Sequence, residues 1–213
     1  MKKDSFKFVE DLFLRRADTA YLKNAIESAV DAICGLGENK KILLCGNGGS
    51  AADCEHFAGE LNKGFILKRR ITNELEKKID GLYPEDTALF VKHLQQGVPS
   101  VPLTSFISTN TAYLNDCEPD LLFAQGVNSL GNRGDVLVCF STSGNSANVL
   151  YAAKLAKAKG LTVVSFTGES GGKLKYLSDV LLNVPSSVTH LIQEYHLSLY
   201  HTICLCVENE LFA

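Results

Sequence analysis

Apolar residues recur along the chain in two alternating patterns, which predict helices and buried strands in turn. Over residues 6–37 they return at steps of three and four, as on one face of an α-helix. The same spacing is sustained longest at 189–212. Short apolar runs of strand length lie at 41–46, 101–108, 136–140, 162–168 and 180–186.

Strands that alternate with helices indicate a parallel sheet covered on both faces, and about five strands are expected. A single domain over residues 1–213 is predicted, with an N-terminal helical segment at about 1–38. Residues 65–100 interrupt the alternation. There we expect two short helical pieces joined through residues 81–86, before a strand at 101–108 that begins near Pro102.

Composition limits the kinds of partner. The 213 residues are 46% hydrophobic and 21% charged, with a formal net charge of −3, so no global field favours nucleic acid or an anionic membrane. The basic cluster at 67–70, "LKRR", is interpreted as a solvated face or loop. The N-terminus has no uninterrupted apolar segment typical of a signal peptide, and no run is long enough to span a bilayer.

The chain has seven cysteines, an odd number, without a C-x-x-C pair. Most lie inside apolar runs, which indicates small buried side chains in a reducing compartment. We therefore expect a cytoplasmic protein.

Two polar loops follow predicted strands and precede predicted helices. "GNGGS" at 46–50 and "STSGNS" at 141–146 combine glycines with hydroxyl side chains, and both features suit phosphate binding at a helix start. Neither loop has the spacing of a P-loop or a dinucleotide site, so no nucleotide cofactor is expected. Each loop alone is also compatible with a tight turn or a helix cap.

Polar side chains also punctuate two helices. His56 and Glu60 are four residues apart, on one face of the helix that follows the first loop. Such a pair can transfer protons or ligate a metal, and it can equally be a surface or packing pair. Gln193, His196 and His201 interrupt an otherwise apolar helix, where core histidines are the alternative.

The motifs "CGNGGSAAD-EHFAGEL", "STSGNSANV", "FTGESGGKL" and "VPSSVTHLIQEYH----H" together resemble the sugar isomerase (SIS) domain family. Within it they are similar to the phosphoheptose isomerases, which convert sedoheptulose 7-phosphate to glycero-manno-heptose 7-phosphate. The resemblance covers nearly the whole chain except about 65–103. It implies an α/β fold, a flavodoxin-like three-layer α/β/α sandwich with a five-stranded parallel sheet. It also implies a homotetramer with active sites at subunit interfaces, and a zinc ion at each.

The resemblance assigns roles to particular residues. Reaction through an enediol would use Glu60 as base and His201 as acid. His56, Glu60, Gln193 and His201 match a zinc site. Substrate contacts are implied for Asn47, Gly48, Gly49, Ser50, Glu60, Asn115, Asp116, Ser141, Thr142, Ser143, Ser146 and Gln193.

Gln193 and His201 are eight residues apart, or about 12 Å along a regular helix. Zinc bonds are near 2 Å. We therefore predict that the two residues reach one metal from different subunits, or that the helix is irregular.

The segment at 65–103 departs from the family pattern and could be a lid, an interface arm or a peripheral helical hairpin. It leaves open an isomerase for another sugar phosphate. A non-catalytic sugar-phosphate-binding or regulatory SIS protein is a further alternative. Such a protein would not need all of His56, Glu60, Gln193 and His201.

Overall fold

The computed structural model describes residues 1–213, apart from the side chain of Lys3. Its centre is a five-stranded sheet in the order β2-β1-β3-β4-β5, with every neighbouring pair parallel. This arrangement confirms the predicted α/β fold with a parallel sheet. The strands are β1 (Ile42–Cys45), β2 (Ser100–Pro102), β3 (Val136–Phe140), β4 (Thr162–Thr167) and β5 (Val180–Asn183).

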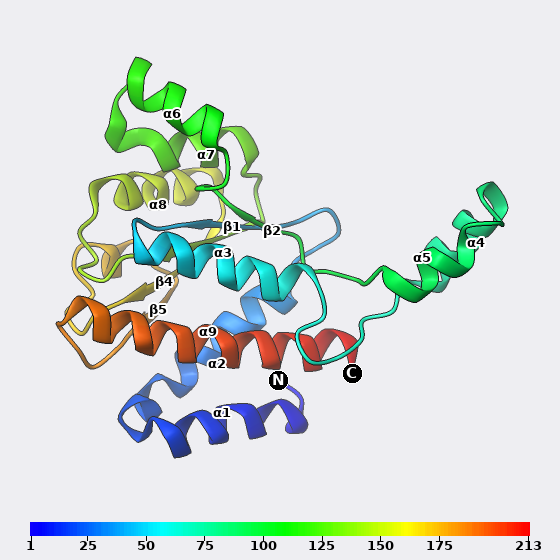
Figure 1. The fold of residues 1–213 in the computed structure, drawn as a ribbon. Helices are drawn as coiled ribbons and strands as arrows, with labels where there is room; N and C mark the ends of the chain where they lie inside the picture. Colours follow the sequence, from blue (N-terminus) through cyan, green and yellow to red (C-terminus); the bar gives the residue numbers. More distant parts are fainter.

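Helices cover both faces of the sheet (Figure 1). The α-helices are α1 (Lys3–Arg15), α2 (Lys23–Cys34), α3 (Gly49–Asn62), α4 (Asn73–Leu82), α5 (Thr87–His93), α6 (Ile107–Asp116), α7 (Leu122–Leu130), α8 (Ala147–Lys159) and α9 (Thr189–Phe212). Short 3₁₀ turns lie at Ala17–Leu22, Pro119–Leu121 and Leu174–Tyr176. Within the residues described, none of the helices has the length and apolar character needed to cross a bilayer.

Successive residues of each strand serve opposite faces, which divides the core in two. Ile42 and Leu44 of β1 pack in a cluster with α1, α2, α3 and α9. Leu43 and Cys45 pack instead with α7 and α8. Because both faces are covered, the strands are almost continuously apolar, as the sequence pattern indicated.

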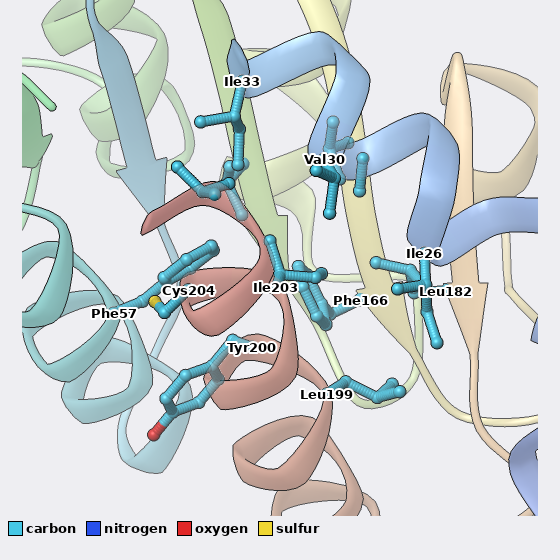
Figure 2. Packing of buried hydrophobic residues seen from close by; sticks show 14 of the residues in the cluster. Ile26, Val30, Ile33, Phe57, Phe166, Leu182, Leu199, Tyr200, Ile203 and Cys204 are labelled. Atoms are coloured by element: carbon cyan, nitrogen blue, oxygen red, sulfur yellow. The ribbon is translucent and has the colours of Figure 1, made fainter. Parts of the chain in front are cut away.

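Helix α9 lies inside the first of these layers. Figure 2 shows its Leu199 and Ile203 directed toward α2 and the sheet, while Cys204 and Tyr200 lie beside Phe57 of α3. The rings of Phe57 and Tyr200 stack with centroids 5.5 Å apart. This packing holds α3 and α9 side by side, which matters for the site below.

The predicted strand at 101–108 is wrong over most of its length. β2 ends at Pro102, and residues from Ile107 onward form α6. Its β-branched and aromatic residues resemble a strand locally, but Asn110 anchors the turn into α6 by donating to the carbonyls of Leu103 and Thr104. The Thr104 and Ser105 hydroxyls also donate to the Glu55 carboxylate of α3. This tertiary contact, together with the bonds of Asn110, overrides the local preference for a strand.

The segment after α3 forms an arm that projects from the body, as Figure 1 shows for α4 and α5. We call residues 71–96 the arm. Every residue within its two helices is exposed or half-buried. The expected pair of short helical pieces is confirmed, and the turn at 81–86 joins them.

The solvated interpretation of the basic cluster at 67–70 is wrong for one residue. Arg69 is only 2% exposed. Its guanidinium is ion-paired with Glu208 at the end of α9, a contact that no local pattern at 67–70 could reveal.

Candidate functional site

The first polar loop turns sharply from β1 into α3. Gly48 has φ +56°, in the left-handed region that favours glycine. A Cβ atom at Gly46 would lie 2.7 Å from the Ser50 carbonyl oxygen, so the turn leaves no room for a side chain there. The glycines of this loop are therefore required by the turn itself, whereas their predicted role in a close approach to a ligand stays a prediction.

The second polar loop connects β3 to α8 and is braced by the loop after β4. Gly144 has φ +65°, and a Cβ atom there would lie 2.2 Å from the carbonyl oxygen of Gly171. The Ser141 and Ser146 hydroxyl oxygens are 3.1 Å apart, and the Ser143 hydroxyl accepts a bond from the backbone N–H of Asn145. Hydroxyls and free N–H groups at the start of α8 can bind an anion.

The two loops meet at the carboxyl edge of neighbouring strands. Asn47 and Asn148 exchange two side-chain hydrogen bonds of 2.9 Å. Asn148 lies at the start of α8 and was missed by the sequence reasoning, although it belongs to the quoted motif "STSGNSANV". Ligands of open parallel sheets bind at this edge, so the loops form one candidate phosphate site.

His56, Glu60 and His201 meet between α3 and α9. His56 Nε2 lies 3.3 Å from Glu60 Oε1 and 3.3 Å from His201 Nε2. The side chain of His56 is 44% exposed, and that of Glu60 is 16% exposed. A partly sheltered carboxylate beside two imidazoles is suited to proton transfer.

Burial lowers the pKa of His201, and the neighbouring His56 lowers it further, against an opposing effect of Glu60. The neutral imidazole of His201 is therefore favoured near pH 7. A neutral imidazole can both accept and donate a proton, one at each ring nitrogen.

The cluster continues inward to two residues that the sequence reasoning missed, Asp53 and Tyr200. The Tyr200 hydroxyl lies 3.0 Å from His56 Nδ1. Burial raises the pKa of Asp53 to about 6, although the nearby Tyr200 hydroxyl and His56 act to lower it. Asp53, His56 and Glu60 follow a spacing of three and four along one face of α3, a signal that could have identified Asp53.

Gln193 and His201 occupy different places along α9, which is a continuous helix. His201 lies against His56. Gln193 lies instead against Gly49, since a Cβ atom added to Gly49 would be 2.5 Å from the Nε2 atom of Gln193. The irregular-helix alternative therefore does not apply within the chain.

Asn115 and Asp116 lie at the end of α6, which packs against α7 on the other face of the sheet from α9 (Figure 1). The Asn115 amide donates to the Asp116 carboxylate. Among the described residues, no hydrogen bond joins either side chain to the two polar loops or to Glu60. Asn115 and Asp116 are therefore not joined to the cluster by a hydrogen bond within one chain.

The donor types and two distances of the cluster are compatible with zinc. Ligand atoms on a tetrahedral zinc with bonds of 2.0–2.1 Å lie about 3.3–3.4 Å from one another. The two 3.3 Å separations around His56 agree with that geometry. Over the part of the chain that the structure describes, however, no group of three or more His, Cys, Asp or Glu side chains is arranged to hold a metal ion.

Comparison with known proteins defines the class. The sequence profile of the SIS domain matches residues 8–81 and 90–168, and the gap between them falls within the arm. The protein belongs to the SIS domain family.

The relatives and solved structures narrow the class to one activity. The chain is 41% identical over 196 residues to the phosphoheptose isomerase of Burkholderia pseudomallei (strain 1710b), covering 92% of this chain and 86% of that relative. It is also similar to the structure of phosphoheptose isomerase GmhA from Neisseria gonorrhoeae, with a TM-score of 0.73, 35% identity and 97% of each chain covered. A phosphoheptose isomerase from Francisella tularensis gives a TM-score of 0.75 at 30% identity, with 95% of each chain covered.

Proposed function

We propose that the protein is a phosphoheptose isomerase, an aldose–ketose isomerase that converts sedoheptulose 7-phosphate to glycero-manno-heptose 7-phosphate. The observation that carries this proposal is the convergence of His56, Glu60 and His201 beside two joined phosphate-type loops. Relatives of that name at 41% identity over most of the chain support it.

The reaction moves one proton between adjacent carbons through an enediol. Glu60 would take the proton from the carbon next to the carbonyl and return it to the neighbouring carbon. His201 would donate a proton to the carbonyl oxygen of the ketose and accept one from the hydroxyl oxygen on the adjacent carbon, as a neutral imidazole can. The carboxylate of Glu60 is poised near His56 and partly sheltered from water, which suits a base of this kind.

The phosphate group would lie in the second loop. Its contacts would come from Ser141, Thr142, Ser143 and Ser146, with the backbone N–H groups at the start of α8. Asn47, Gly48, Gly49 and Ser50 of the first loop would contact the sugar. These contacts position the sugar carbons at Glu60 without taking part in the chemistry.

A zinc ion is proposed as the cofactor. His56, Glu60 and His201 of one chain would hold it, and Gln193 of a neighbouring subunit would complete the set. Bound zinc would polarise the sugar oxygens and stabilise negative charge on them. The separations around His56 support this assignment, and so does the distance along α9 between Gln193 and His201.

A homotetramer with sites at subunit interfaces is proposed for the assembly. Within one chain, Gln193, Asn115 and Asp116 lie apart from Glu60, so a neighbouring subunit is the natural source of these groups. We place the protein in the cytoplasm, with the sugar phosphate as substrate and no nucleic-acid or membrane partner.

The arm, which begins shortly after the helix that carries Glu60, leaves open a second candidate substrate. An isomerase for a different sugar phosphate would use the same proton transfers. A non-catalytic sugar-phosphate sensor would bind through the same loops without turnover.

Proton NMR of the purified protein with sedoheptulose 7-phosphate in D₂O, with and without added zinc, tests the proposal. A growing aldose signal with deuterium at C2 is the expected result. Phosphate-dependent thermal stabilisation without any reaction would instead favour the sensor. Turnover of other sugar phosphates, but not of sedoheptulose 7-phosphate, would support the other isomerase.

A further inference from the structure

A buried ion pair joins the base of the arm to the end of α9. The Arg69 Nε atom lies 2.8 Å from Glu208 Oε1, and both side chains are almost completely buried, at 0% and 1% exposure. Neither residue belongs to the set assigned to substrate or metal. Replacing a buried ion pair by apolar residues often leaves the stability of a protein unchanged or increases it. Stability alone therefore does not explain why this protein has a buried ion pair.

Glu208 holds the segment that follows α3. Its two carboxylate oxygens accept backbone N–H bonds from Phe65, Ile66 and Leu67, at 2.7, 2.9 and 3.0 Å. Burial alone would raise the pKa of Glu208, but these hydrogen bonds and the one from Arg69 lower it below its ordinary value. Glu208 is therefore a charged group with several fixed partners.

Arg69 holds the end of α3 itself. Its Nη1 donates to the Leu61 carbonyl at 2.7 Å, and its Nη2 donates to the Glu60 carbonyl at 3.2 Å. The last carbonyls of a helix lack partners within the helix, so a side chain that binds two of them determines how the helix ends. One of these two carbonyls belongs to the proposed base.

The same contacts reach the proposed acid. Phe65, whose N–H is bound by Glu208, places its ring 5.5 Å from the imidazole of His201 between centroids. His201 and Glu208 are also on the same helix, two turns apart. The ion pair is therefore connected to Glu60 through Arg69 and to His201 through Phe65.

We propose that Arg69 and Glu208 are positioning residues that hold Glu60 and His201 in the relative placement that proton transfer requires. The inference rests on the proposed function, in which Glu60 and His201 act on the sugar. Neither Arg69 nor Glu208 touches the reacting atoms in this account. Their effect is on geometry, and a displacement of about 1 Å at reacting groups can cost on the order of 10²-fold in rate.

The test is steady-state kinetics of Arg69→Lys and Glu208→Gln with sedoheptulose 7-phosphate, well below their melting temperatures. Lysine retains the charge but has no planar fork with which to bind Glu208, Glu60 and Leu61 together. We expect kcat to fall roughly 10- to 100-fold while KM changes less than about threefold, because the phosphate loops lie elsewhere.

Asp135→Asn is the matched control. Asp135 is a buried carboxylate that accepts bonds from the Lys41 side chain and from the backbone N–H groups of Lys41 and Asn132. It lies before β3, at the opposite edge of the sheet from the loops. This variant should lose thermal stability and keep its kcat, which separates a general loss of stability from a loss of positioning.

Phe65→Leu is a second test that leaves the ion pair intact. It can be measured even if the variants at Arg69 and Glu208 do not fold. It should lower kcat with little change in melting temperature. Folded variants at Arg69, Glu208 and Phe65 that all retain kcat within about twofold of wild type would overturn the inference. Inactive wild-type protein would instead count against the proposed function, so the two failures are distinguishable.

Discussion

At the scale of single residues, the central feature is the placement of Glu60 beside His56. Its Oε1 is 3.3 Å from the imidazole, and its Oε2 is 3.3 Å from the Lys63 ammonium group. A carboxylate held between cationic or hydrogen-bonding groups has a defined orientation. We therefore expect the activity to depend on the negative charge of the Glu60 carboxylate, and a neutral side chain of the same shape should not replace it.

Glu60→Gln is expected to lower turnover by about 10²–10⁴-fold, because the amide retains the shape but cannot accept the carbon-bound proton. Binding of sedoheptulose 7-phosphate, measured by calorimetry, should change little. Glu74→Gln, on the exposed surface of α4, is the control and should be fully active. Residual activity above about a tenth of wild type would contradict the assignment of Glu60 as base.

His196 provides a prediction about pH. It is completely buried beside Phe140 and Phe166, and its Nε2 donates to the Thr167 carbonyl. Burial lowers its pKa from 6.5 to about 4, with the Thr167 contact acting in the opposite direction. The unfolded chain therefore binds a proton between about pH 6.5 and pH 4 that the folded chain does not bind. This contribution to stability is present above pH 6.5 and is lost as pH falls toward 4.

The size of this contribution is about 3 kcal/mol. Urea unfolding between pH 4.5 and 7.5 measures it. His196→Gln should show a shallower pH dependence of the unfolding free energy than wild type, whereas His93→Gln on the exposed end of α5 should match wild type. Equal slopes for wild type and His196→Gln would contradict the prediction.

At the scale of elements, the arm is the part of the chain least attached to the rest. Helices of this length are marginal on their own in water, and α4 and α5 bury none of their described residues completely. Exposed apolar side chains remain on the arm, at Leu75, Leu82, Tyr83, Leu89 and Leu94. The two ends of the arm are close together, since Arg70 and Gln95 form an antiparallel bridge.

Replacing residues 72–94 by a short Gly-Ser linker should therefore leave the body folded. Circular dichroism should show a cooperative melt within a few degrees of wild type, because the helices of the arm contribute little to the core. A linker inserted at residues 132–134 would be unsuitable as a control, because it would disturb the hydrogen bond from the Asn132 backbone N–H to the Asp135 carboxylate. A simple length control is the same linker added after Ala213. Failure of the shortened protein to fold would show that the arm is part of the body.

At the scale of the whole molecule, the packing of α3 beside α9 decides which site residues share one chain. His56 and His201 meet within the chain, although they are 145 positions apart. Gln193 does not reach them, because it lies further toward the N-terminal end of α9, against Gly49. In the proposed site, a second subunit would therefore supply Gln193.

Mixing subunits tests this arrangement. Glu60→Gln and Gln193→Ala homo-oligomers should each be impaired. Refolding them together should restore part of the activity, because some sites then draw Glu60 and Gln193 from intact copies. The control mixture, Glu60→Gln with His201→Gln, should stay inactive, since those two residues come from the same chain. Mixed oligomers without any regained activity would contradict a shared site.

Much of this protein was determined by its sequence alone. The five-stranded parallel sheet was expected from alternating strands and helices and is confirmed, as is membership of the SIS domain family. The two polar loops and the pairing of His56 with Glu60 also followed from local spacing. These features depend on neighbours a few residues away, so pattern and turn chemistry are sufficient to predict them. The roles assigned to the site residues, the zinc ion and the tetramer remain predictions.

Other features were decided only by tertiary structure. Arg69 appeared to belong to a solvated basic cluster, but its partner Glu208 is 139 positions away. Asp53 and Tyr200 join the site because α3 and α9 pack side by side. The turn into α6, where a strand was expected, is bonded to Glu55 of α3 through Thr104 and Ser105. In each case the deciding contact is between residues distant along the chain, where the free energy of burial and of satisfied hydrogen bonds outweighs local preference.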